Sequence, residues 1–220
     1  MIMKSHKIFK SPANKTDLFA DSAKRMHKFE QRNKLMEKTN AIRNKTYNVA
    51  QNDTYKTYSN YALAYGLMKK YLKNLKGKKI LRLGSSISLF MNFLQENHKS
   101  EAIGLDLLHE HIGIGKNAGL KKALQSDATK LPFKNNSINC IYSEHFFGPS
   151  YLNEKELAKI TTETARVLKP KGLFMISNFG EFDFSGIQEI ISSSKHFNLI
   201  EIAQTHKSPS QYTFVLQKMS

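Results

Sequence analysis

The stretch KILRLGSSISLFMNFLQENHKSEAIGLD, residues 79–106, decides the fold. It opens with a short apolar run, Lys79 to Leu83, and closes with a second one, Ala102 to Leu105. Between them, Ile87 to Asn97 carries apolar residues at helical spacing. Apolar runs bounded by glycine and polar residues are typical of buried strands. A strand, a helix and a second strand in close succession predict one right-handed crossover of a parallel sheet.

The same alternation continues towards the C-terminus. The remaining expected elements are strands over 123–125, 138–142 and 173–177 and helices over 107–117, 153–168 and 184–193. Two last apolar runs, 197–202 and 212–216, flank a loop with Pro209 and are expected to pair antiparallel at one edge of the sheet. The predicted fold is α/β, a doubly wound, mostly parallel seven-stranded Rossmann-like sheet.

Composition excludes several classes of protein. The chain has 220 residues, of which 40% are hydrophobic, so it can build a packed core and is neither collagen-like nor wholly disordered. Its longest apolar runs fall far short of the roughly 18–20 residues of a membrane span. The single cysteine, Cys140, excludes an internal disulfide and a cysteine-based zinc site, and the histidines form no metal-ligand set. A reducing compartment, and therefore a cytoplasmic location, is the expectation.

Charge divides the chain unevenly. Residues 1–79 hold 19 basic and 5 acidic residues, whereas residues 80–220 hold 15 and 13. We expect a flexible basic tail over 1–15, a helical N-terminal extension over 16–76 and the α/β domain over 77–220. The basic segment would suit a polyanion or an acidic protein partner, although a solvated, solubilising face explains the same charge.

Tyrosines concentrate in the expected extension. Tyr55, Tyr58, Tyr61 and Tyr65 recur every three or four residues and would share one face of a helix. Such a face can stack nucleic-acid bases. It can equally pack on the body of the protein or roof a pocket, which is the interpretation that we favour.

Ligands of doubly wound sheets bind beyond the carboxyl ends of the strands. The residues that follow the first four strands here are Gly84, Ser85, Ser86 and Ser88, then Asp106 and Leu107, then Asp127 and Ala128, then Ser143, Glu144 and His145. An aspartate beyond a strand end can accept hydrogen bonds from both hydroxyls of a ribose. The alternative role of each aspartate is a helix N-cap or a turn former.

Two stretches resemble a known family. SDATKLPFKNNSINCIYS (126–143) and ETARVLKPKGLFMIS (163–177) are similar to segments of the class I S-adenosylmethionine-dependent methyltransferases, and most closely to their type 11 domains. The resemblance runs from about Lys78 to Lys218. It implies S-adenosylmethionine as the cofactor and methyl transfer to an acceptor that the sequence does not identify.

The resemblance also implies roles by position. The first loop, with Gly84, Ser85, Ser86 and Ser88, would hold the methionine part of the cofactor. Asp106 with Leu107 would bind the ribose, Asp127 with Ala128 the adenine, and Ser143 would face the cofactor from the fourth strand. The helix that carries Tyr61 would roof the donor, Glu144 to Phe147 would face the acceptor, and His145 with Glu144 would be the catalytic candidates.

The first loop departs from the family pattern. Arg82 stands where the family has an acid, Ser86 and Ser88 replace glycines, and Asn139 replaces a common aspartate. Arg82 could meet the cofactor's carboxylate, bind a phosphate, or pair with Asp106 or Glu144. These departures motivate a second hypothesis, in which the chain is an inactive pseudo-methyltransferase that serves as a binding or scaffold module through its basic N-terminal arm.

Overall fold

The computed structural model describes residues 54–85, 89–117, 119–147, 152–179, 187, 190, 194–204 and 211–220. The expected tail, the expected helix within residues 16–45 and most of the helix expected over 184–193 lie outside these residues. The described helices are α3 (Thr54–Leu72), α4 (Leu89–His98), α5 (His109–Asn117) and α6 (Glu154–Val167). The strands are β1 (Lys79–Leu83), β2 (Glu101–Asp106), β3 (Lys122–Gln125), β4 (Ile138–Glu144), β5 (Leu168–Phe179), β6 (Phe197–Gln204) and β7 (Gln211–Lys218).

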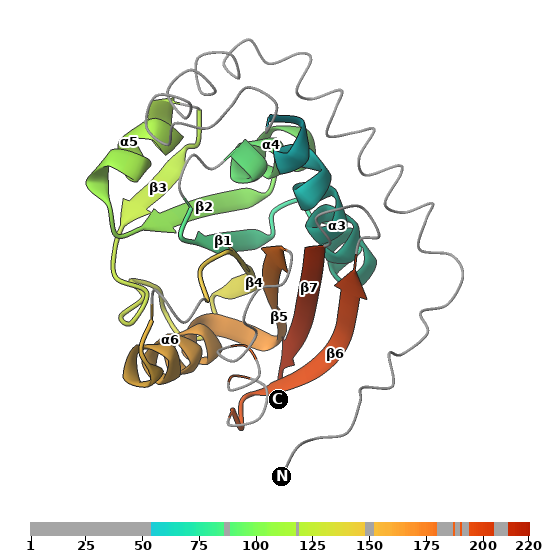
Figure 1. The fold of residues 1–220 in the computed structure, drawn as a ribbon, viewed down its shortest axis with the longest axis vertical. Coiled ribbons are helices and arrows are strands. Elements are labelled where there is room, and N and C mark those ends of the chain that lie inside the picture. The colour runs from blue at the N-terminus through green and yellow to red at the C-terminus, as the bar shows by residue number, and fades with distance from the viewer. Residues whose placement is uncertain are drawn as a thin grey trace.

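The strands form one sheet in the order β3-β2-β1-β4-β5-β7-β6 (Figure 1). The first five strands pair in parallel, and β7 pairs antiparallel with both β5 and β6. The strand order reverses between β1 and β4, which is where doubly wound sheets bind ligands. The predicted mostly parallel seven-stranded sheet and the terminal antiparallel pair are confirmed.

Helices α3 and α4 cover one face of the sheet. Tyr65 and Met68 of α3 are buried in the same cluster as Phe93 of α4 and Ile80 of β1. The rings of Tyr65 and Phe93 meet edge to face, with centroids 5.2 Å apart. Helix α3 is therefore part of the main core, so the tyrosine-bearing helix packs on the body of the protein, which is the interpretation favoured from the sequence.

Helix α6 covers the opposite face. Leu157 and Ile160 join the second buried cluster, with residues such as Ile141 of β4. The side chain of Asn153 accepts a hydrogen bond from the Glu156 backbone, and the Glu156 side chain accepts one from the Asn153 backbone, so a reciprocal cap begins the helix.

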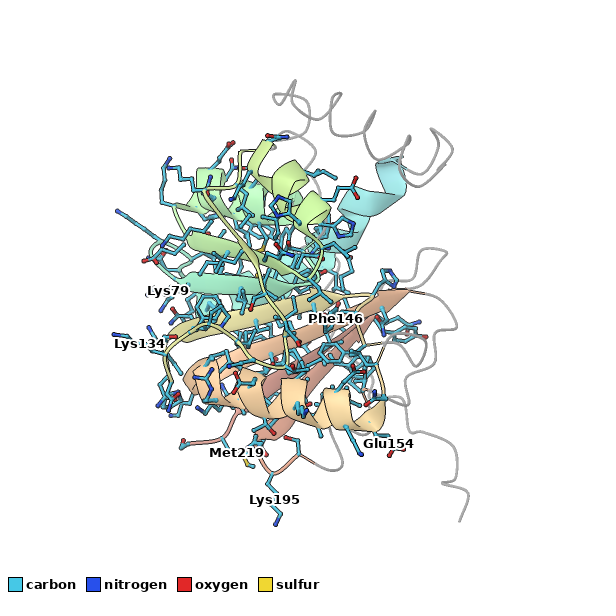
Figure 2. All side chains as sticks on the ribbon, turned by 90° about the vertical axis from the view of Figure 1, so that its left-hand side faces the viewer. Lys79, Lys134, Phe146, Glu154, Lys195 and Met219 are labelled. Atoms are coloured by element: carbon cyan, nitrogen blue, oxygen red, sulfur yellow. The ribbon has the colours of Figure 1, made fainter. Side chains whose placement is uncertain are left out.

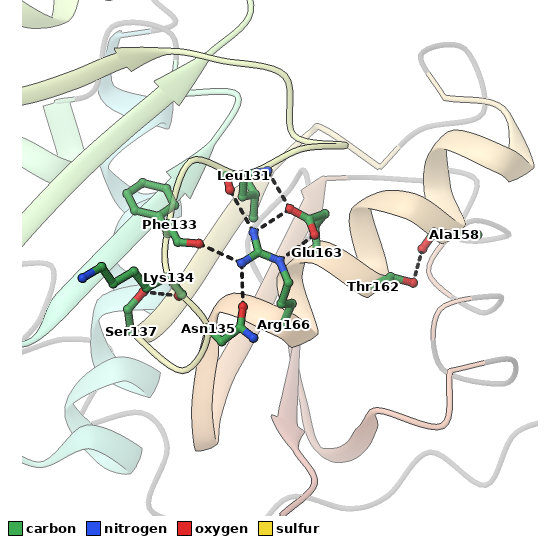
Figure 3. A network of polar contacts seen from close by, with 9 residues as sticks. All are labelled: Leu131, Phe133, Lys134, Asn135, Ser137, Ala158, Thr162, Glu163 and Arg166. Atoms are coloured by element: carbon green, nitrogen blue, oxygen red, sulfur yellow. Dashed lines mark hydrogen bonds and ion pairs between the residues drawn. The ribbon is translucent and has the colours of Figure 1, made fainter.

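Arg166, near the end of α6, fastens that helix to the loop before β4 (Figure 3). Its guanidinium donates to both carboxylate oxygens of Glu163 at 2.7 and 2.8 Å. It also donates to the carbonyl oxygens of Phe133 and Leu131 and to the side-chain oxygen of Asn135. All three guanidinium nitrogens thus have partners, and this contact joins the two stretches of sequence that carry the family resemblance.

The two edges of the sheet face in opposite directions (Figure 2). Lys79, which begins β1, and Lys134 lie at the amino edge, whereas Phe146, beyond the end of β4, and Glu154, which begins α6, lie at the carboxyl edge. The residues predicted from the sequence to form a site follow strand ends, so they lie at the carboxyl edge. Among the described helices, none is long and apolar enough to cross a membrane.

Candidate functional site

Backbone hydrogen bonds hold the ends of β1, β2 and β3 together. The Ser85 amide donates to the Leu105 carbonyl at 2.9 Å, which fixes the loop after β1 beside the end of β2. The Ser126 amide donates to the Asp106 carbonyl at 3.0 Å, which fixes the segment after β3 beside the same strand end. Three of the four loops predicted to form the site therefore meet at one edge.

Asp106 is the more enclosed of the two aspartates predicted to bind the cofactor. Its carboxylate accepts a hydrogen bond from the Leu108 amide at 3.0 Å and lies 3.2 Å from Nδ1 of His111. The first contact forms a turn beyond β2, so α5 begins at His109 instead of Leu107, where the sequence pattern placed it. The turn orients the carboxylate at the strand end.

Beside Asp106 the surface is apolar. Leu107 is 65% exposed and Leu108 54% exposed, an unusual degree of exposure for two consecutive leucines. Asp127 is also exposed, and its carboxylate accepts from the Thr129 amide at 2.7 Å, whereas Ala128 is buried in the α6-side core. An apolar surface flanked by two oriented carboxylates suits a flat ring that bears hydrogen-bond donors.

Gly84 turns the loop after β1. Its φ of 62° lies in the left-handed region that glycine adopts most easily. A β-carbon at this position would lie 2.9 Å from Cδ2 of Phe146, so the open side of Gly84 receives that ring. Phe146 was included in the segment expected to face the acceptor, but its contact with Gly84 could not be predicted from the sequence.

Arg82 lies at the centre of a buried cluster. Its Nη2 is 3.0 Å from Oε2 of Glu144, and its Nη1 donates to the Tyr61 hydroxyl at 3.2 Å. The guanidinium carbon lies 5.3 Å from the ring centroid of Tyr61 and 5.7 Å from that of Tyr142. Tyr61 in turn stacks on Phe90 at 4.9 Å. One side chain therefore joins β1, β4 and the covering helix α3.

The cluster is almost entirely buried, and one of its hydrogen-bond donors has no partner. The side chains of Arg82 and Glu144 are only 6% and 7% exposed. Burial alone would lower the pKa of Arg82, but the Tyr61 oxygen and the Glu144 carboxylate outweigh it and raise that pKa, so the guanidinium stays charged. Its Nε is buried without a hydrogen-bond partner. An unsatisfied buried donor of this kind costs about 1–3 kcal/mol.

The two catalytic candidates lie in different surroundings. Glu144 points to the face of the sheet covered by α3 and pairs with Arg82, so Glu144 is the acid that contacts Arg82 of the two that the sequence offered, Asp106 and Glu144. His145 has a φ of 53° and an exposed side chain, and its amide donates to the Ser177 carbonyl at 3.1 Å. Partial desolvation and the charge of Arg82 lower the pKa of His145 to about 4. The imidazole is therefore neutral at pH 7 and only weakly basic.

The side chain of Ser143 points to the opposite face of the sheet from those of its neighbours on β4, Tyr142 and Glu144. Side chains alternate along a strand, so Ser143 points to the α6 side, away from Arg82 and Glu144. Its hydroxyl is fully buried and has no hydrogen-bond partner. Ser86 and Ser88 lie outside the described residues. The same alternation places Tyr142 and Glu144 on one face, and this signal could have identified Tyr142 as a member of the site.

Within the described residues, no group of three or more His, Cys, Asp or Glu side chains is arranged to hold a metal ion. The basic segment expected to bind a polyanion or an acidic partner comprises residues 1–79. Its larger part, residues 1–53, lies outside the described residues.

Comparisons with known proteins agree on the fold. Residues 81–176 match the type 11 family model described as a methyltransferase domain. The structure resembles S-adenosylmethionine-dependent methyltransferases from Aquifex aeolicus (TM-score 0.57, 16% identity, covering 70% of this chain and 89% of that one) and Methanosarcina mazei (TM-score 0.58, 16% identity, 70% and 97%). A curated relative, the uncharacterized protein MJ1252 of Methanocaldococcus jannaschii, is 36% identical over 88 residues. That match covers 40% of this chain and 34% of the relative.

Proposed function

We propose that this chain, whose residues 81–176 match the type 11 methyltransferase-domain model, is a class I S-adenosylmethionine-dependent methyltransferase that binds S-adenosylmethionine and transfers its methyl group to an unidentified acceptor. One observation carries the proposal. Asp127 follows β3 and Asp106 ends the adjacent strand β2, and both are side chains of the type that the family uses at these positions. Backbone hydrogen bonds join these strand ends to the Gly84 loop after β1.

The residues after β2 and β3 fit the adenosine part of this cofactor. Asp106 offers an oriented carboxylate to the ribose hydroxyls, and Asp127 offers another to the amino group of adenine. Leu107 supplies an exposed apolar surface that a purine ring would cover. The unpartnered Nε of Arg82 further along the same edge is a buried donor that a ligand oxygen would satisfy.

When bound, the cofactor supplies an electrophilic methyl group on a positively charged sulfur. The contribution of the chain is to bind, to orient and to exclude water. Tyr61, Tyr142 and Phe90 build an aromatic wall around Arg82 that keeps water from the edge of the site. Because His145 is weakly basic at a pKa of about 4, we assign the acceleration to the placement of donor and acceptor, with no general base required.

The test is titration calorimetry of the full chain with S-adenosylmethionine and S-adenosylhomocysteine. We expect binding by the native protein and at least about tenfold weaker binding by Asp106→Ala, because the ribose hydroxyls lose a charged acceptor. Glu110→Ala is the matched control, since it removes one acid from the exposed side of the neighbouring helix α5. Unchanged affinity in Asp106→Ala would refute the proposed pocket.

The absence of any binding by the native chain would instead favour the pseudo-methyltransferase hypothesis. The search for a partner would then turn to the basic N-terminal segment. Binding of a polyanion through that segment should weaken steeply as salt is raised, because phosphate contacts release counterions.

A further inference from the structure

The carboxyl edge of the sheet carries a row of charged side chains. In the strand order β3-β2-β1-β4, Asp127 follows the first, Asp106 ends the second, Arg82 lies near the end of the third and Glu144 ends the fourth. Neighbouring strands are about 4.8 Å apart, so the row extends over roughly 14 Å. If the proposed function holds and adenosine binds at the first two positions, the other end of the ligand lies at the last two.

Those last two positions hold a complete pair of opposite charges. Arg82 and Glu144 lie 3.0 Å apart and are almost entirely removed from water. An amino-acid end is a zwitterion, with a carboxylate and an ammonium group on one carbon. A fixed cation and a fixed anion side by side complement a zwitterion, whereas a single acid complements only its ammonium group.

A purely structural role leaves one feature unexplained. Arg82 Nε is buried without a partner. Buried ion pairs are seldom retained for stability alone, because the cost of desolvating two charges offsets their attraction. A ligand carboxylate at this point would accept the unused N–H and complete the hydrogen bonding of the guanidinium.

We propose that the Arg82–Glu144 pair recognises the zwitterionic amino-acid end of the S-adenosyl ligand, with Arg82 facing its carboxylate and Glu144 its ammonium group. Both residues are then specificity-determining residues. Tyr61 is a positioning residue, because its hydroxyl holds the guanidinium in place. In the family pattern the acid is on the first strand. In this chain Arg82 occupies that position, and the acid beside it, Glu144, is on the fourth strand.

The first measurement needs no substitution. Calorimetry on the native full chain compares S-adenosylhomocysteine with three analogues, one without the carboxylate, one without the amino group and one, 5′-methylthioadenosine, without the amino-acid end. We expect each single deletion to weaken binding about tenfold or more. Equal affinity for all four compounds would overturn the inference while leaving adenosine binding and the proposed function intact.

The second measurement uses Glu144→Gln, which keeps the shape of the side chain and removes its charge. We expect about tenfold to a hundredfold weaker binding of S-adenosylhomocysteine and a less than about threefold change for 5′-methylthioadenosine. Glu163→Gln is the matched control, because it makes the same chemical change in the Arg166 pair at the other edge. It should leave both affinities unchanged.

A parallel loss of both affinities in Glu144→Gln would show that the pair only supports the structure, and would overturn the inference. If Glu144→Gln fails to fold, Glu144→Asp keeps the charge but withdraws it by one methylene, and the same selective loss is expected. If the native chain binds S-adenosylhomocysteine and 5′-methylthioadenosine equally weakly, the inference fails and the proposed function stands. If it binds neither compound, both the inference and the proposed function fail.

Discussion

Two arginine–glutamate pairs lie at opposite edges of this sheet, and they are built differently. At the amino edge, Arg166 makes five hydrogen bonds that use all three nitrogens, and its side chain is 31% exposed (Figure 3). At the carboxyl edge, Arg82 is 6% exposed, contacts one carboxylate oxygen and one hydroxyl, and leaves Nε without a partner.

The contrast is the one expected if the Arg166 pair is structural and the Arg82 pair has the recognition role proposed above. Arg166 fastens a loop to a helix, and its hydrogen bonding is complete within the protein. Arg82 is costly to bury and its hydrogen bonding is incomplete, which is the condition expected of a residue that awaits a ligand. Substitutions at the two edges should therefore differ in stability and in binding.

The largest effect is expected for Arg82→Met. This substitution leaves the Glu144 carboxylate buried without its cation, and the free energy of unfolding should fall by about 3–5 kcal/mol. Urea denaturation followed by circular dichroism measures it. If Arg82→Met cost no more than Arg166→Met, the two pairs would be energetically alike and the comparison would fail.

A double substitution sharpens this result. In Arg82→Met/Glu144→Leu both charges are replaced by apolar groups of similar volume, and stability should return to the native value or exceed it by about 1–4 kcal/mol. Binding of S-adenosylhomocysteine should stay lost. Recovery of both stability and binding would contradict the assignment of the pair to recognition.

The next largest effect is expected for Arg166→Met. It removes hydrogen bonds to Leu131, Phe133 and Asn135. The carboxylate of Glu163 stays partly exposed to solvent, so no unpaired charge is buried. We expect a loss of about 1–3 kcal/mol in the free energy of unfolding and unchanged affinity for S-adenosylhomocysteine. A weaker ligand affinity would mean that the amino edge is coupled to the site.

The sequence predicted the fold well because the fold follows from periodicity. All five expected parallel strands and the final antiparallel pair are present, since short apolar runs with glycine or polar boundaries have few other solutions. Strand β5 is longer than expected: it starts at Leu168 directly after α6 and includes Lys171, whose φ is 60°.

The site was predicted only in part. The positions of residues that follow strands, such as Asp106 and Asp127, could be predicted because topology alone gathers strand ends at one edge. The contacts of Arg82 could not be resolved between Asp106, Glu144 and a ligand, because the choice depends on side-chain direction across strands that are distant in sequence. The ring of Phe146 against Gly84 was missed for the same reason.

A smaller effect is expected for Tyr61→Phe. The ring and its stacking on Phe90 are kept, and only the acceptor for Nη1 of Arg82 is lost. The free energy of unfolding should fall by about 0.5–1.5 kcal/mol, the usual contribution of one buried hydrogen bond. S-adenosylhomocysteine should bind less tightly than to the native chain, since the guanidinium is less well held. A change in stability with no change in affinity would confine Tyr61 to a packing role.

The smallest effect is expected from the pH dependence that His145 contributes. Its pKa is about 4 in the folded chain and 6.5 when unperturbed, so between these values the unfolded chain binds a proton that the folded chain does not. Stability should therefore decrease as the pH falls from 6.5 to 4, and this contribution should be constant above and below that window. His145→Asn removes the titrating group and tolerates the positive φ. The stabilities of the two proteins, measured by urea denaturation at intervals from pH 8 to 4, should diverge only within the window. Parallel curves would show that neither desolvation nor the charge of Arg82 lowers the pKa of His145 in the folded chain.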